Sequence, residues 1–137
     1  MSTVKIILGQ VSETAVQIQN SDFKVVVDRP ESKGGGGLGL MGGQYMLAGV
    51  GGCFCSTLFA AAQSRDIQIE GLKVEVNGTI SEELPKRFTD ISLDISCSSC
   101  SQPSEFEKLL AIAEKGCISV NTVKNGISFK VRETKEV

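Results

Sequence analysis

The sequence contains no histidine among its 137 residues, although five residues are cysteine. The absence of histidine removes the side chain that most often acts as a general base and most often binds zinc. Triads of the Ser-His-Asp type and Cys-His pairs are therefore excluded within a single chain. The chain also lacks any cluster of lysine or arginine, and its net charge is −2. Composition therefore indicates no nucleic-acid partner.

The chain also shows no signal peptide before Val4, where an apolar, strand-like run begins. An odd number of cysteines cannot all pair within one chain, so we expect free thiols in a cytoplasmic protein. No internal repeat and no long linker interrupts the sequence. We therefore expect a single domain that spans residues 1–137.

Charged side chains are absent from residues 34–64. Residues 44–65 contain no proline and lack the alternation typical of strands, which predicts one largely buried helix of about six turns. Residues 37–42 match the pattern G-x-G-x-x-G, but eight residues (29–36) separate this match from the preceding strand. Because a dinucleotide fingerprint follows its strand directly, a flexible loop is the favoured interpretation. The uncharged stretch could span a bilayer by length, but its many glycines disfavour insertion, and we expect no membrane contact.

Alternating apolar residues predict strands at 4–9, 23–28, 72–80, 87–97 and 127–131. The strands at 72–80 and 87–97 are expected to pair antiparallel across the loop at 81–86. A capping box of Ser104 and Glu107 predicts the start of a second helix, which ends at Gly116.

Three glycines, Gly49, Gly51 and Gly52, lie inside the predicted central helix. Each costs about 1 kcal/mol relative to alanine in a helix interior. Close approach of another backbone would offset this cost, and in a chain this small a second subunit is expected to supply part of the contact.

The five cysteines fall into distinct settings. Cys53 and Cys55 lie about 200° apart around the helix axis and cannot bridge each other. Cys97 and Cys100 form a C-x-x-C, for which packing and oxidation are both open, but a zinc site would need a second such pair, so no metal is expected. Packing alone suits Cys55. Packing is a poorer explanation for Cys53, which is in mid-helix among glycines, and for Cys117, which directly follows a helix end. The five cysteines are Cys53, Cys55, Cys97, Cys100 and Cys117.

The segment Gly51-Gly52-Cys53-Phe54 resembles the helix cysteine motif of the OsmC/Ohr family of thiol-dependent hydroperoxide reductases. Residues 113–117 (Ala-Glu-Lys-Gly-Cys), followed by Asn121, resemble the second cysteine motif of that family. Residues 65–76 and 87–89 are similar to the strands that lie between the two motifs. The similarity extends over nearly the whole chain.

The resemblance implies an α+β fold with antiparallel sheets packed around a long central helix and a second helix, in an intertwined homodimer. It implies that the Cys53 thiolate attacks the peroxide O–O bond and that Cys117 condenses with the resulting sulfenic acid to a disulfide. An external dithiol would then reduce the disulfide. This peroxiredoxin-type, oxidative-stress chemistry requires no metal and no organic cofactor.

The sequence departs from the family pattern at the groups that ionise the helix cysteine. The family places an arginine on an N-terminal strand and a glutamate ten residues before that cysteine. Those positions fall near Val11 and at Gly43, next to the polar Gln44. Arg29 and Lys33, in the loop before the helix, are the candidates to supply the missing positive charge, because a thiol of pKa near 8.5 needs a cation or a helix N-terminus to ionise.

Two hypotheses follow. In the first, the protein is a cytoplasmic homodimeric enzyme that reduces organic hydroperoxides or related small electrophiles through Cys53 and Cys117. In the second, which rests on the missing arginine and glutamate, the dimer has kept the fold but not the peroxidase activity. It would then bind a small apolar ligand, or exchange sulfur or disulfides with a partner.

Overall fold

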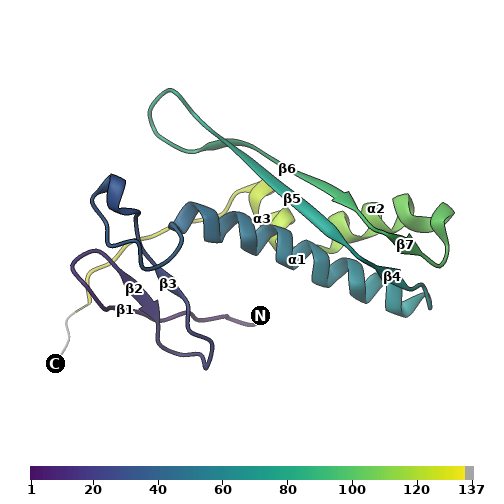
Figure 1. The fold of residues 1–137 in the computed structure, drawn as a ribbon, viewed down its shortest axis with the longest axis horizontal. Coiled ribbons are helices and arrows are strands. Elements are labelled where there is room, and N and C mark those ends of the chain that lie inside the picture. Colours follow the sequence, from purple (N-terminus) through teal and green to yellow (C-terminus); the bar gives the residue numbers. More distant parts are fainter. Residues whose placement is uncertain (135–137) are drawn as a thin grey trace. The chain divides into compact units, whose positions relative to one another are not determined.

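The computed structural model describes residues 1–134 and divides into two compact units, Met1–Ala48 and Gly49–Val137. The boundary between the units falls inside the long helix α1 (Gly42–Ser64) (Figure 1). Within residues 1–134 there are seven short or medium strands, all paired antiparallel, and three α-helices. The predicted α+β class is therefore confirmed.

The first unit contains a three-stranded sheet in the order β1 (Leu8–Gln10), β2 (Val16–Ile18) and β3 (Val26–Val27). Strands were predicted at 4–9 and 23–28, and the paired segments are shorter and shifted toward the ends of those ranges. A short 3-10 helix, η1 (Glu31–Lys33), follows β3.

A buried carboxylate organises the glycine-rich loop of this unit. Asp28 is only 3% exposed and accepts hydrogen bonds from Thr14 Oγ1 (2.8 Å) and from the backbone N–H groups of Arg29 (2.7 Å), Gly36 (3.1 Å) and Leu38 (3.2 Å). Burial tends to raise the pKa of Asp28, but the four hydrogen bonds together hold this pKa below its ordinary value. The loop amides at Gly36 and Leu38 therefore bind the protein's own carboxylate.

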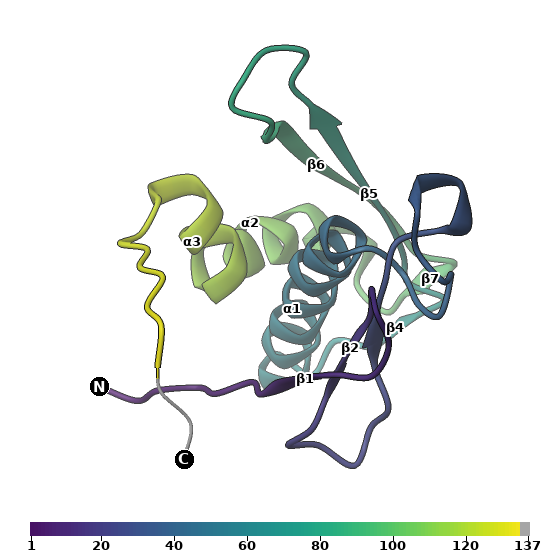
Figure 2. The same cartoon turned by 90° about the vertical axis from the view of Figure 1, so that its left-hand side faces the viewer.

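The second unit is built around the remainder of α1. The hairpin of β5 (Lys73–Ile80) and β6 (Phe88–Ser96) pairs antiparallel, as the sequence predicted, and its register places Val76 opposite Leu93. Half-buried and exposed residues alternate along both strands, so that one face of the hairpin packs against the core. The tip of the hairpin extends beyond the helices of its unit in both views (Figures 1 and 2). A short pair, β4 (Ile69–Glu70) with β7 (Ser99–Cys100), closes the base of the hairpin.

Two further helices, α2 (Phe106–Gly116) and α3 (Ile118–Asn125), complete this unit. The core gathers apolar side chains from α1, α2 and the turn between α2 and α3. Its most buried members are Phe54, Leu58, Ala62, Ile67, Leu109, Ala113 and Cys117.

Among the described residues, only one of the three central glycines meets a close neighbour. A Cβ atom on Gly51 would lie 2.6 Å from Val76 Cγ2, whereas nothing lies within 4 Å of a Cβ on Gly49 or Gly52 among the described residues. The close neighbour of Gly51 is thus a side chain of strand β5, and the expected approach of another backbone, in part from a second subunit, stays a prediction.

Two local predictions were wrong. Residues 127–131 form no strand, and Ile127, Phe129 and Val131 are 71%, 82% and 85% exposed. Within the described residues no strand lies beside this segment to accept its backbone hydrogen bonds. The capping box is also absent, since η2 (Pro103–Glu105) occupies its position and α2 begins at Phe106 without a side-chain cap.

Helix α1 is long and apolar enough to cross a membrane by length and composition alone. The core helix of a soluble protein satisfies the same two criteria. Six of the 23 residues of α1 are buried against the rest of the chain, so a single chain covers less of this helix than the largely buried helix that the sequence predicted; they are Val50, Gly51, Phe54, Leu58, Ala61 and Ala62.

Candidate active site

Two sulfur atoms from distant parts of the sequence lie next to each other in the second unit. The thiol of Cys117 donates a hydrogen bond to Cys53 Sγ, at a sulfur–sulfur distance of 3.5 Å. Cys53 is half-buried in the middle of α1, and Cys117 is fully buried at the junction of α2 and α3. All five cysteines are free thiols.

The junction between α2 and α3 places Cys117. Helix α2 ends at Gly116, and Cys117 then takes an extended conformation (φ −82°, ψ 119°) as the N-cap of α3. Its carbonyl accepts a hydrogen bond from Asn121 N (3.0 Å), and the Asn121 side chain donates to Lys115 O (3.0 Å) across the turn. A Cβ on Gly116 would lie 3.5 Å from Thr57 Cγ2, so the junction contacts α1 one turn beyond Cys53.

The first turn of α3 begins beside the Cys53 sulfur, because the sulfur of its N-cap residue, Cys117, is 3.5 Å away. A hydrogen bond from the Ser119 side chain is the strongest influence that lowers the pKa of the Cys53 thiol, and the Ser119 backbone N–H adds to it. Burial opposes this effect, whereas further hydrogen bonds from the Cys117 thiol and the Ile118 backbone lower the pKa again. The net result is a pKa below the ordinary value of Cys53.

Ser119 was missed by the sequence analysis, which considered only a neighbouring cation and the N-terminus of α1 itself. The N-terminus that reaches Cys53 belongs to a different helix, α3. A serine two residues beyond Cys117 was the available signal, because serine favours the first turn of a helix once a helix is expected there.

The other predicted site residues all lie in the first unit. Arg29 and Lys33 are exposed, and their proposed action on Cys53 stays a prediction. Gln44 is in the first turn of α1, and its Oε1 accepts a hydrogen bond from Met41 N at 3.0 Å. This contact caps the helix in the manner of the third residue of a capping box.

The remaining cysteines have separate surroundings. Burial raises the pKa of Cys55, which suits a thiol that packs rather than reacts. Cys100 packs against the core, and its thiol contacts Gln102 O at 3.4 Å. Within residues 1–134, no group of three or more histidine, cysteine, aspartate or glutamate side chains lies close enough together to hold a metal ion.

An apolar groove of about 580 Å³ lies between α1, β6, α2 and α3. Its walls include Val50 and Phe54 from α1, Leu93 from β6, Leu110 from α2 and Val120 from α3. Phe54 directly follows Cys53, and Val120 directly follows Ser119. The groove is large enough for a small apolar molecule.

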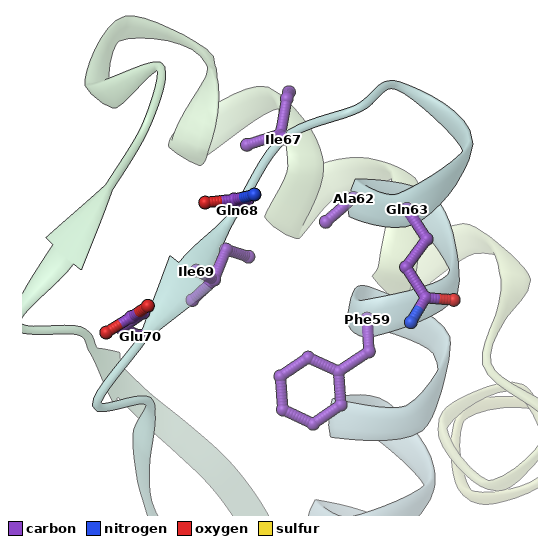
Figure 3. A pocket seen from close by; sticks show the side chains of 7 residues that line it. All are labelled: Phe59, Ala62, Gln63, Ile67, Gln68, Ile69 and Glu70. Carbon is purple, nitrogen blue, oxygen red and sulfur yellow. The ribbon is translucent and has the colours of Figure 1, made fainter.

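A second pocket, of about 360 Å³, lies at the end of α1. Figure 3 shows Phe59, Ala62 and Gln63 of α1 on one side of it and residues 67–70 on the other. Among the described residues that line it there is no cysteine, and Glu70 is the only charged residue. This pocket therefore does not belong to the thiol pair.

Comparison with protein-family models gives a match to the family described as "OsmC-like protein" over residues 34–132. Among solved structures, an OsmC-like protein from Mycoplasma pneumoniae is similar with a TM-score of 0.75 and 19% identity, covering 91% of this chain and 89% of that chain. An organic hydroperoxide resistance protein OsmC from Legionella pneumophila is similar with a TM-score of 0.69 and 21% identity, covering 91% of this chain and 93% of that chain. The organic hydroperoxide resistance protein OhrB of Bacillus subtilis gives 0.67 and 15%, also with 91% and 93%. No curated protein matches this chain significantly.

Proposed function

Because the chain belongs to the OsmC-like protein family, we propose that it is a soluble, cytoplasmic redox protein that reduces organic hydroperoxides through Cys53 and Cys117. The observation that carries the proposal is the 3.5 Å distance between the two sulfur atoms. Two similar structures, from Legionella pneumophila and Bacillus subtilis, are named as organic hydroperoxide resistance proteins, which supports the same chemistry here.

The surroundings of the two thiols support a division of roles between them. Cys53 has the lowered pKa and is partly accessible, so it is the nucleophile. Its thiolate attacks one oxygen of the hydroperoxide, the O–O bond breaks, and the alkoxide leaves and takes a proton to become an alcohol. Cys53 is then a sulfenic acid, oxidised by two electrons.

Cys117 completes the cycle as the resolving thiol. Its sulfur attacks the sulfenic sulfur of Cys53, water leaves, and an intramolecular disulfide forms. The two sulfur atoms must approach by about 1.5 Å to reach the S–S bond length of roughly 2 Å. An external dithiol then reduces the disulfide by exchange and becomes oxidised itself, which restores both thiols.

A homodimer is part of the proposal, and two unpartnered surfaces support it. Along α1, Met46 is exposed, and no described atom lies within 4 Å of a Cβ placed on Gly49 or Gly52. The segment 127–131 exposes three alternating apolar side chains and has the sequence pattern of a strand without a neighbour. A second copy of the chain could bury both surfaces.

The alternative function is binding of a small apolar ligand without peroxide reduction. The observation that favours it is the apolar groove of about 580 Å³ that reaches Phe54 and Val120. In the hydroperoxide reductase, the same groove is a suitable place for the organic part of the substrate.

The test is to mix reduced protein with cumene hydroperoxide and to measure thiol loss and cumyl alcohol. We expect Cys53→Ser to abolish both. We expect Cys117→Ser to react once and to accumulate a sulfenic acid that dimedone traps. Cys55→Ser is the matched control and should react like the parent protein. Peroxide consumption by Cys53→Ser at the parent rate would overturn the proposal, whereas a parent protein that consumes no peroxide would leave ligand binding as the function.

A further inference from the structure

The apolar groove between α1, β6, α2 and α3 has one charged edge. Glu107 and Glu114 of α2 and Lys124 of α3 line this edge, whereas the other described side chains that line the groove are apolar. Lys124 Nζ lies 3.0 Å from Glu114 Oε2, so these two charges neutralise each other. Lys124 is the only cation among the described lining residues, and Glu107 therefore leaves the edge with a single net negative charge.

The two carboxylates lie at either end of the α2 side of the groove. Glu107, Ala111 and Glu114 all line it and are spaced by four and three residues, which places them on one face of the helix. A helix rises by 1.5 Å per residue, so the backbone positions of Glu107 and Glu114 are separated by about 10 Å along α2. A ligand that lies along this side therefore meets a carboxylate at each end.

The groove is lined by the segments that carry the two thiols. Val50 and Phe54 of α1 line the groove, and Cys53 lies three residues after Val50, on the same side of the helix. Val120 of α3, which also lines the groove, lies three residues after Cys117. The organic part of a molecule that reacts at Cys53 thus has an apolar site beside it.

We propose that this groove binds the uncharged, apolar part of the substrate and that Glu107, together with the Glu114–Lys124 ion pair, selects against substrates that carry a carboxylate. A carboxylate taken out of water needs a cationic or hydrogen-bonding partner, and the one lysine at this edge is already paired. Glu107 repels a second negative charge. The substrate class is therefore a neutral organic hydroperoxide. The inference rests on the proposed function where it names a hydroperoxide, but the charge selection can be measured with ligands that are not peroxides.

The experiment is a fluorescence titration of the full-length reduced protein at low ionic strength with two dyes that share a ring system. N-phenylnaphthylamine is neutral, and anilinonaphthalene sulfonate carries a negative charge. We expect the neutral dye to bind about tenfold more tightly. Glu107→Gln should raise the affinity for the sulfonate by about fivefold and leave the affinity for the neutral dye unchanged. Lys124→Gln releases the charge of Glu114 and should weaken sulfonate binding by a similar factor.

Two further variants test the location and the origin of the effect. Ala111→Trp places a large ring in the groove and should abolish binding of both dyes. Glu75→Gln is the matched control, because it removes the same charge from an exposed position on strand β5 that does not line the groove, and it should change neither affinity. Circular dichroism checks that each variant is folded. Unchanged sulfonate binding in Glu107→Gln and Lys124→Gln, or dye binding that survives Ala111→Trp, would overturn the inference.

A matched pair of substrates separates this inference from the proposed function. A fatty-acid hydroperoxide and its methyl ester differ only in the carboxylate. The parent should reduce the ester with the higher kcat/KM, and Glu107→Gln should narrow the difference. Equal kcat/KM values for acid and ester would overturn the inference and leave the proposed function standing. The expected dye selection without reduction of either hydroperoxide would overturn the proposed function alone.

Discussion

The contact between Gly51 and Val76 gives a stability prediction that is independent of function. Replacing Gly51 with alanine adds a methyl group whose carbon would lie 2.6 Å from Val76 Cγ2. Real carbon–carbon contacts are about 3.5–4.0 Å, so one of the two groups must move by roughly 1 Å. Val76 is β-branched and half-buried on strand β5, which limits the rotamers available to it.

Two opposing effects set the change in the free energy of unfolding caused by Gly51→Ala. Alanine is favoured over glycine inside a helix by about 0.5–1 kcal/mol, whereas inserting a methyl group into a packed contact costs roughly 1–3 kcal/mol. We expect the second effect to be the larger, so that Gly51→Ala lowers the free energy of unfolding by about 1 kcal/mol. Val76→Ala removes the obstructing methyl groups at a cost of roughly 1 kcal/mol, because the side chain is only half-buried.

A double-mutant cycle measured by urea unfolding isolates the contact. In the Val76→Ala background, Gly51→Ala should become stabilising, which gives a coupling free energy of roughly 1–3 kcal/mol. Gly52→Ala is the control, since no described atom lies within 4 Å of its added methyl group and its effect should be the same in both backgrounds. If Gly51→Ala has the same effect with and without Val76, then α1 does not approach β5 as closely as described here.

Three shorter predictions concern other parts of the molecule. The stabilisation from the lowered pKa of Asp28 is complete when the pH is above 3.8, the ordinary pKa of the carboxyl group, and it is lost as the pH falls through the lower pKa of the folded protein. Acid should therefore lower the melting temperature of the parent more than that of Asp28→Asn. At neutral pH, Asp28→Asn should melt at a lower temperature than the parent. Phe129→Ser should shift sedimentation toward single chains, and an unchanged sedimentation coefficient would contradict a role of residues 127–131 in the dimer. Lys124→Ala removes an ion pair with Glu114 whose side chains are 58% and 55% exposed, and it should change the unfolding free energy by less than about 1 kcal/mol.

The parts of the fold that were predictable have local sequence patterns. In the hairpin, apolar and polar residues alternate from Lys73 to Asn77 and from Ile91 to Ser96, and the register follows because a shift by one residue would expose Ile91, Leu93 and Ile95. The long helix is predicted equally well, since an uncharged run without proline or alternation has few alternatives.

The parts that were not predictable depend on partners distant in the sequence. Residues 127–131 have the sequence pattern of a strand, but a strand also needs a neighbouring strand to hydrogen-bond with, and none lies beside them among the described residues. The same limit applies to the Gly-rich loop, where the sequence does not show that Gly36 and Leu38 donate to the carboxylate of Asp28. The proximity of Cys53 and Cys117 was expected only through the resemblance to a family, because 64 residues separate them.

Helix α3 shows why the origin of the low Cys53 pKa was the hardest feature to foresee. Residues 118–125 include four β-branched side chains, which favour strands in isolation; they are Ile118, Val120, Thr122 and Val123. Tertiary packing rather than helix propensity stabilises this helix, because Val120 packs against the core and Cys117 is buried at its N-cap. Once the helix exists, its unpaired N–H groups must find an acceptor. The sulfur of Cys53 lies beside this turn, since the sulfur of Cys117 at the N-cap is 3.5 Å from it, so the fold of α3 and the surroundings of the Cys53 thiol are linked. Any substitution that unwinds the first turn of α3 should therefore raise the pKa of Cys53 as well as lower stability.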